Sequence, residues 1–291
     1  MDSRRGTLSA ALPACAPLPA LMIGILAMRQ LGVSTSAWSV NIAATVLGLL
    51  IWFAGRRLPP LRRRVTRAFL AAASIATILL PFASEGMLGV HRWVSMGGFR
   101  LHAAAIAAPL IILCVAAAAS DRIGSALAIG TAGAIILALQ PDAAQTTSFA
   151  AACAVILVPL RRTQPRQVVL GVALLLAVSV ASFVRRDPLP PVAHVEGIFG
   201  VVASGGPGSA VMAAVALLLL PAPFFAAWLR RRRATALALG VYVAMTLLAS
   251  AWGTVPVPVM GYGASPILGY FLALAVGLGG PSRFEDRSRE P

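Results

Sequence analysis

The amino-acid sequence predicts an all-α integral membrane protein with about ten transmembrane helices. Its mean hydropathy is +0.86, and 59% of its 291 residues are hydrophobic while only 11% are charged. A soluble chain of this length could not cover its surface with so few charged side chains. Because ten crossings use most of the chain, we expect a single polytopic membrane domain over residues 1–291.

The ten predicted spans follow one another with short connections. Each crossing of a bilayer needs about 20 apolar residues. The candidate segments lie near 17–33, 38–54, 68–84, 102–119, 123–140, 146–160, 167–184, 209–229, 234–252 and 264–280. Residues 1–16 and 281–291 are then left as the N-terminal and C-terminal tails.

The positions of the arginines orient these spans. The net charge of +15 comes from arginine alone, because the sequence contains no lysine. Loops that face the cytoplasm are enriched in positive charge. With the N-terminus in the cytoplasm, 19 of the 24 arginines lie in cytoplasmic segments, and the five outer ones are Arg29, Arg92, Arg100, Arg185 and Arg186. This alternation predicts that both tails are cytoplasmic, and arginines in short loops between apolar segments argue against nucleic-acid binding.

Four outer segments hold most of the residues that could carry chemistry. They read EGMLGVHRWVSMGGFR (85–100), QPDAAQ (140–145), RRDPLPPVAHVEGIFG (185–200) and GTVPVPVMGYGASP (253–266). The cytoplasmic loops consist of little more than arginine. The three cysteines, Cys15, Cys114 and Cys153, lie far apart without metal or redox spacing. We therefore expect recognition or catalysis on the outer face and no protein metal centre.

Taken in order, these outer segments resemble the SEDS membrane proteins (shape, elongation, division and sporulation; the FtsW, RodA and SpoVE type). GVHRWVSMGGF resembles the family's Gly…Arg-Trp…Gly loop after the third helix, LQPDAAQTT its Gln-Pro-Asp motif, and VPVPVMGYGASP its Pro-rich Ser-Tyr-Gly-Gly segment before the last helix. The motif residues are Trp93, Gln140, Pro141, Asp142, Pro258, Tyr262, Gly263 and Ser265. The resemblance implies a SEDS-like helical bundle with its functional loops on the outer face.

The segment LPPVAHVEGIFG is similar to the stretch in which the family carries its catalytic carboxylate, Leu-Pro-Glu-Ala-His-Thr-Asp-Phe. Glu196 stands where the family has Asp, and His194 matches the family's His. The resemblance implies a peptidoglycan glycosyltransferase of the bacterial inner membrane that polymerises undecaprenyl-pyrophosphate-linked sugars during division or elongation. Glu196 would be the general base and His194 a supporting residue. A penicillin-binding transpeptidase, or another protein of the division or elongation machinery, would be its partner.

Elementary chemistry agrees with this assignment in kind. A carboxylate at the boundary of the membrane is partly desolvated, which makes it a better base. A pyrophosphate leaving group needs positive charge, and the forked guanidinium is suited to phosphate oxygens. Arg92, Arg185 and Arg186 are the outer arginines nearest the motifs, and a divalent cation could share their task.

Two departures from the family keep other interpretations open. The stretch RLHAAAIAAPL lacks the family's Glu and Lys, and the outer loop before Glu196 is shortened to RRDPLPP. Glu in place of Asp also moves the carboxylate by about one methylene, and an error of ~1 Å can cost roughly 10²-fold in rate. The alternatives are a non-catalytic scaffold for a transpeptidase and, ranked last, a flippase for a lipid-linked precursor.

The single residues have plainer alternatives as well. Glu196 could serve only to favour a helix N-terminus through the helix dipole. Arg92 and Trp93 could belong to the interfacial belt of the membrane. Asp142 could only cap the next helix, and Tyr262 could be an interfacial anchor.

Overall fold

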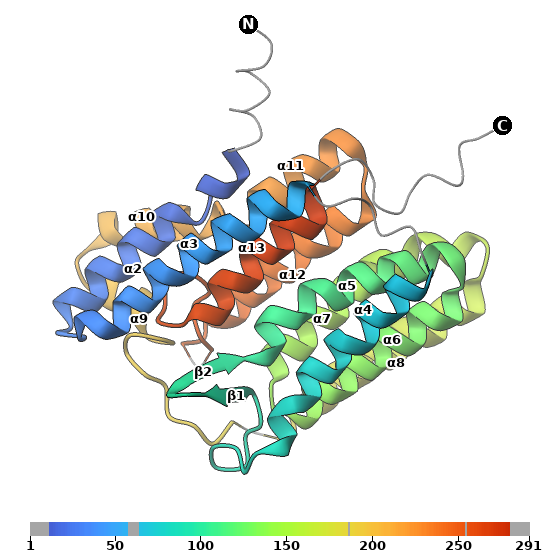
Figure 1. The fold of residues 1–291 in the computed structure, drawn as a ribbon, viewed down its shortest axis with the longest axis horizontal. Helices are drawn as coiled ribbons and strands as arrows, with labels where there is room; N and C mark the ends of the chain where they lie inside the picture. The colour runs from blue at the N-terminus through green and yellow to red at the C-terminus, as the bar shows by residue number, and fades with distance from the viewer. Residues whose placement is uncertain (1–11, 58–63, 186, 254, 280–291) are drawn as a thin grey trace, which may run out of the picture.

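The computed structural model describes residues 12–57, 64–185, 187–253 and 255–279. Within these ranges the chain is a helical bundle with one small β-hairpin (Figure 1). The predicted C-terminal tail (281–291) and residues 1–11 of the predicted N-terminal tail lie outside the described residues. Residues 12–16 of that predicted tail fall within the helical span Leu12–Gln30.

Each of the ten predicted apolar segments falls on a helix or on two consecutive helices. The long helices are α2 (Leu18–Gln30), α3 (Thr35–Arg57), α4 (Arg64–Leu79), α5 (Ala103–Asp121), α6 (Ile123–Leu139), α7 (Ala143–Leu157), α8 (Pro165–Ser182), α10 (Pro207–Leu218), α11 (Ala222–Arg231), α12 (Ala234–Ser250) and α13 (Ala264–Leu278). Short 3-10 turns, η1 (Leu80–Ala83) and η2 (Val158–Arg162), extend α4 and α7. The pattern of apolar runs therefore located the helices well.

Six helices in the described ranges are long and apolar enough to cross a membrane, or seven if the bent pair α10 and α11 is one span. That pair bends by 41° at its break. Helices α6, α12 and α13 are apolar but shorter, at 15 to 17 residues. The protein is therefore a multi-pass helical membrane protein, and the count of ten crossings stays a prediction.

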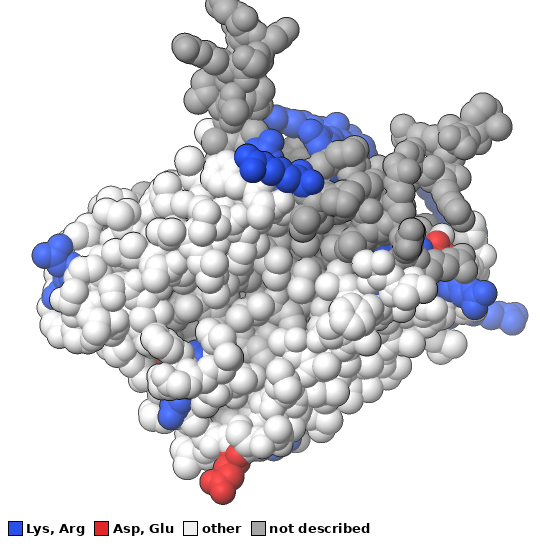
Figure 2. All heavy atoms as spheres, viewed as in Figure 1, with Lys and Arg blue, Asp and Glu red and all other residues white. Residues whose placement is uncertain are grey.

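The surface agrees with this assignment. Large apolar side chains stand exposed along the outside of the bundle, among them Leu50 on α3, Phe69 on α4 and Leu170 on α8. The flank seen in Figure 2 is a broad uncharged area, with arginines gathered toward its ends. Lipid tails, rather than water, are the solvent that such a flank fits.

The bundle has two groups of helices that meet along α5, α7, α12 and α13. Helices α2, α3 and α10–α13 lie on one side and α4–α8 on the other (Figure 1). Helix α13 packs on both α3 and α5, and α12 packs on α7. A Cβ added at Gly269 of α13 would lie 1.9 Å from the carbonyl oxygen of Ala105 in α5. Only glycine allows the two backbones to come this close.

A β-hairpin, absent from the sequence-based prediction, closes one end of the bundle. Strand β1 (Trp93–Met96) pairs antiparallel with β2 (Phe99–His102), and Gly97 and Gly98 form the turn with positive φ. Two glycines between short strands are a recognised signal for a tight hairpin turn. Strand β2 runs directly into α5, so the hairpin places residues 92–102 at the end of the bundle that the arginine pattern predicts to face outward, which we call the outer end.

Candidate functional site on the outer face

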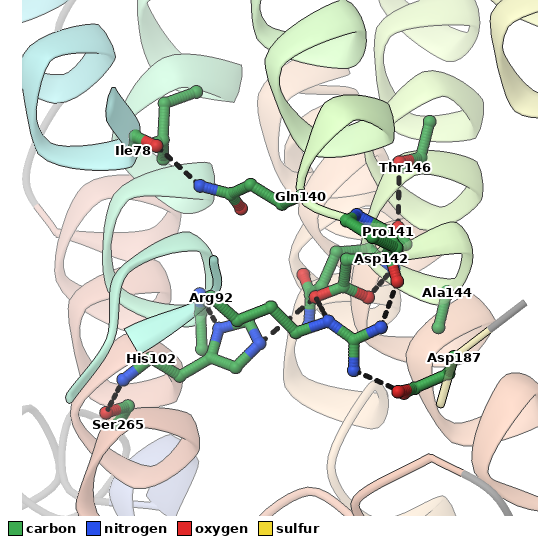
Figure 3. Close-up of polar contacts among 12 residues, drawn as sticks. Ile78, Arg92, His102, Gln140, Pro141, Asp142, Ala144, Thr146, Asp187 and Ser265 are labelled. Atoms are coloured by element: carbon green, nitrogen blue, oxygen red, sulfur yellow. Dashed lines mark hydrogen bonds and ion pairs between the residues drawn. The ribbon is translucent and has the colours of Figure 1, made fainter. Parts of the chain in front are cut away.

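A buried arginine lies at the centre of the outer end. Arg92 just precedes β1, and only 8% of it is exposed. Its Nη1 donates to Asp187 Oδ2 at 2.6 Å and its Nη2 donates to the carbonyl oxygen of Pro141, while its Nε lies 3.6 Å from Asp142 Oδ2 (Figure 3). One guanidinium thus joins the hairpin, the start of α7 and the shortened outer loop. We call these three residues, Arg92, Asp142 and Asp187, the outer clamp.

His102 adds a fourth ionisable group beside the clamp. Its Nε2 lies 3.1 Å from Asp142 Oδ2, and its Nδ1 accepts the N–H of Ala105 at 3.2 Å. Because Nδ1 is an acceptor, the Nε2 nitrogen carries the proton and donates to Asp142. The same side chain therefore caps α5 and holds the carboxylate of Asp142.

Asp142 caps α7, as one of the sequence-based interpretations expected. Its Oδ1 accepts the N–H of Gln145 at 3.1 Å, and 5% of the residue is exposed. Burial raises the pKa of this carboxyl. The charge of Arg92 and the hydrogen bonds from His102 and Gln145 together lower the pKa by more than burial raises it, to about 2. Asp142 is therefore ionised at neutral pH and balances Arg92.

Neighbouring side chains brace the clamp from three other helices. The Nε2 of Gln140 donates to the carbonyl oxygen of Ile78, at the end of α4, at 2.5 Å. The hydroxyl of Ser265, in α13, accepts the backbone N–H of His102 at 2.8 Å, and Tyr242 of α12 donates to Gln145 at 2.6 Å. The predicted motif residues Gln140, Asp142 and Ser265 thus lie in one region, although Gln140 and Ser265 are 125 positions apart in the sequence.

Glu196 lies in a second region, where the outer loop meets the segment before α13. The segment from Val192 to Gly197 is a turn, and the Oε2 of Glu196 accepts the N–H of Val192 at 2.8 Å. The carbonyl oxygen of His194 accepts the N–H of Tyr262 at 2.9 Å, and that of Val195 accepts the N–H of Val257 at 3.2 Å. Residues 192–197 and 257–262 therefore support each other through backbone hydrogen bonds.

The rings of His194 and Tyr262 complete this contact. They meet edge to face with their centroids 5.9 Å apart. Pro258 accepts the N–H of Met260 at 2.8 Å and so tightens the turn before Tyr262. Gly263 has a φ of +144°, a backbone conformation that suits glycine, and its N–H is bound by a side chain from α3.

That side chain is Asn41, which the sequence analysis did not single out. It is fully buried, donates to the carbonyl oxygen of Gly261 at 3.0 Å and accepts the N–H of Gly263 at 3.0 Å. A lone amide within an apolar span is a signal for a functional or structural role, because an unpaired one would be costly there. Tyr242, within the apolar span 234–252, was also not predicted, and neither was Gln145 at the end of QPDAAQ.

The structure places the other predicted residues as follows. Trp93 lies beside Arg92 and packs edge-on to His102, with ring centroids 6.0 Å apart. Arg185 is exposed, and its Nη1 donates to the carbonyl oxygen of Leu139 at 3.0 Å. Arg186 lies outside the described residues. Within the described ranges, Glu196 forms no ion pair with an arginine.

A divalent cation does not fit the protein side chains described. No group of three or more His, Cys, Asp or Glu that could hold a metal ion occurs in the described ranges. Asp142 and Asp187 already point at Arg92 (Figure 3).

The fold has close counterparts among solved structures. The rod shape determining protein RodA of Thermus thermophilus matches with a TM-score of 0.68 at 20% identity, over 92% of this chain and 95% of RodA. A point mutant of the same RodA matches over the same shares of both chains with a TM-score of 0.70, also at 20% identity. A chain from a peptidoglycan synthase complex, described for its structural coordination of polymerization and crosslinking, matches with a TM-score of 0.65 at 22% identity, over 93% of this chain and 98% of that one.

Sequence comparison alone finds less: no protein-family model and no curated protein matches this chain. Agreement over nine-tenths of both chains at about 20% identity is evidence on architecture. The protein therefore has the fold of RodA, a protein of the SEDS type that its outer motifs resemble.

Proposed function

We propose that the protein is a SEDS-type glycosyltransferase of the bacterial inner membrane that polymerises lipid-linked peptidoglycan precursors. Two observations support the proposal: the RodA fold extends over 92% of the chain, and the turn that carries Glu196, the one carboxylate of LPPVAHVEGIFG, is bonded through its backbone to residues 257–262. By the arginine pattern, both segments lie on the outer face. Lipid-linked sugar precursors present their sugars on this side of the membrane.

The proposed step is a displacement at the anomeric carbon of the donor. Glu196 takes the proton of the acceptor hydroxyl, whose oxygen forms the new bond to the anomeric carbon. The bond from that carbon to the pyrophosphate oxygen breaks, and undecaprenyl pyrophosphate leaves. The Oε2 of Glu196 is held by the N–H of Val192. This hydrogen bond fixes the carboxylate and leaves the second oxygen to receive the proton.

Outer arginines would stabilise the leaving pyrophosphate. Arg185 is exposed and has one nitrogen on the carbonyl oxygen of Leu139, so it can turn toward a phosphate without breaking an ion pair. Arg186 follows it directly in sequence. Arg92 is held by Asp187 and Asp142, and within this proposal it reaches the pyrophosphate only when Asp187 releases it.

The test is polymerisation of labelled lipid II by the purified protein, with and without a candidate transpeptidase. Glu196→Gln keeps the shape of the side chain and removes the base, so we expect glycan product to fall by at least 10²-fold. Glu85→Gln, which removes an exposed carboxylate of a different outer segment, is the control and should keep activity. Equal product from wild type and Glu196→Gln would refute the role of Glu196.

A non-catalytic scaffold is the second candidate function, and one observation favours it. In the described part of the chain, Arg92 is paired with carboxylates and Glu196 forms no ion pair. A structural neighbour also comes from a peptidoglycan synthase complex, and a transpeptidase is the partner we propose. Two results together would support the scaffold. Crosslinking to that partner would be the same in wild type and Glu196→Gln, and wild type would not turn over lipid II.

A further inference from the structure

A cavity lies at the end of the bundle opposite the outer motifs, where α4 begins, α5 ends and α6 begins. Its volume is about 270 Å³, and it opens between α4, α5 and α6, which lie together on one side of the bundle (Figure 1). Its polar lining is Arg67, Asp121, Arg122 and Ser125, and the wall below them is formed by small apolar residues such as Ala71 and Ala118. Arg67 and Arg122 are among the arginines that predict the cytoplasmic side.

The charges of this cavity leave one arginine available. Arg67 donates to Asp121 at 2.7 Å, so the single carboxylate of the lining is already bound to one arginine. Arg122 is exposed, and its side chain forms no hydrogen bond or ion pair within the described ranges. Two arginines against one aspartate give the cavity a net positive charge, which suits an anion.

The backbone adds donors at the same place. Arg122 is the N-cap of α6, and no side chain caps this helix. The first N–H groups of a helix attract anions, and Ser125, in the first turn of α6, also lines the cavity. A phosphate placed here would meet a guanidinium, a hydroxyl and unpaired N–H groups.

The apolar wall identifies the remainder of the ligand. Ala71 and Ala117 of the lining are buried, while Phe69 and Val65, outside the lining on α4, are exposed apolar side chains. A ligand with a phosphate at the cytoplasmic boundary and an apolar body along the helices would match both parts of the cavity. Basic pockets between transmembrane helices on the cytoplasmic side bind anionic lipid head groups.

We infer that this cavity binds an anionic glycerophospholipid of the cytoplasmic leaflet, with its phosphate at Arg122, Ser125 and the start of α6. The inference is independent of the glycosyltransferase proposal, because it involves neither Glu196 nor the outer loops. Such a lipid would hold α4 against α5 and α6.

The test is native mass spectrometry of the purified full-length protein in a neutral detergent. Dioctanoyl phosphatidylglycerol, dioctanoyl phosphatidylcholine and sn-glycerol 3-phosphate are titrated separately. We expect saturable binding of phosphatidylglycerol and at least tenfold weaker binding of the other two. Arg122→Gln should weaken phosphatidylglycerol binding about fivefold, the effect of one arginine at a membrane surface.

Two further variants separate the cavity from general surface charge. Arg162→Gln removes an exposed arginine of the same face that does not line the cavity, and binding should not change. Ala118→Leu fills the cavity without altering charge, and binding should fall as in Arg122→Gln. Equal losses in Arg122→Gln and Arg162→Gln, no loss in Arg122→Gln or Ala118→Leu, equal binding of the two lipids, or equally strong binding of glycerol phosphate would each overturn the inference.

Discussion

Asp187 shows at the scale of a residue how a shortened loop is held. Asp187 belongs to the shortened loop RRDPLPP, and in the structure its carboxylate reaches the Nη1 of Arg92 at 2.6 Å. Nine residues further along the chain stands Glu196. The clamp therefore fixes the start of the segment whose end carries the candidate base.

Asp187→Asn tests this anchoring. We expect a loss of roughly 1–3 kcal/mol in the free energy of unfolding, since a charge-assisted hydrogen bond is removed from an arginine that stays buried. The melting temperature in detergent, followed by tryptophan fluorescence, measures the loss. Glu85→Gln is the control and should melt like wild type. An Asp187→Asn protein as stable as wild type would show that the clamp does not hold the loop.

Asp142 predicts how stability depends on pH. Its pKa in the folded protein is about 2, below the ordinary value near 3.9. The ionised carboxylate therefore stabilises the fold above pH 4, and this contribution, on the order of 2 kcal/mol, is lost as the pH falls from about 4 to about 2. Melting temperatures of wild type and Asp142→Asn should converge over this window. Parallel pH profiles for the two proteins would contradict the prediction.

At the scale of the element, close helix contacts depend on single glycines. Gly269 lets α13 approach the backbone of α5, one turn after Ser265, which binds the N–H of His102. A similar contact joins α2 to the Tyr262 segment, because a Cβ at Gly24 would lie 1.9 Å from the carbonyl oxygen of Met260. These contacts fix the position of the start of α13. They thereby position both the outer clamp, through Ser265 and His102, and residues 257–262, which contact the Glu196 turn.

Gly269→Ala should therefore destabilise the protein by about 1–3 kcal/mol, because backbone atoms must move to admit the methyl group. Gly124→Ala is the matched helical control, since nothing lies within 4 Å of a Cβ added there, and the change should be neutral or slightly stabilising. Thermal unfolding of both variants in one detergent provides the comparison. Equal melting temperatures for the two variants would refute the close-packing argument.

At the scale of the whole molecule, the orientation in the membrane can be tested with cysteine labelling. Ser204 lies in a predicted outer loop and Thr163 in a predicted cytoplasmic loop, and both are exposed. In a background with Cys15→Ser, the buried Cys114 and Cys153 should not react. A membrane-impermeant maleimide added to spheroplasts should label Ser204→Cys and not Thr163→Cys. The reverse pattern would overturn the predicted topology.

The sequence by itself determined the class and the position of the helices. In lipid, the backbone of a long apolar run must satisfy its hydrogen bonds internally, which a helix does. Predicted segments such as 38–54 and 234–252 therefore overlap α3 and α12. Arginine clusters predicted the orientation for the same kind of reason, since charge is costly to move across a bilayer. The order of the outer motifs also indicated the RodA fold, because a motif of consecutive residues can be recognised in a sequence without knowing which residues are in contact.

Only the tertiary structure decided which polar residues meet. The sequence grouped Arg92 with Arg185 as phosphate ligands, whereas the fold turns Arg92 inward onto Asp142 and Asp187. It could not indicate that Asn41, 220 positions before Gly261, holds the segment that faces His194. Such pairs depend on how helices pack, and packing is set by small differences in volume, such as the missing Cβ of Gly269, that no local pattern records.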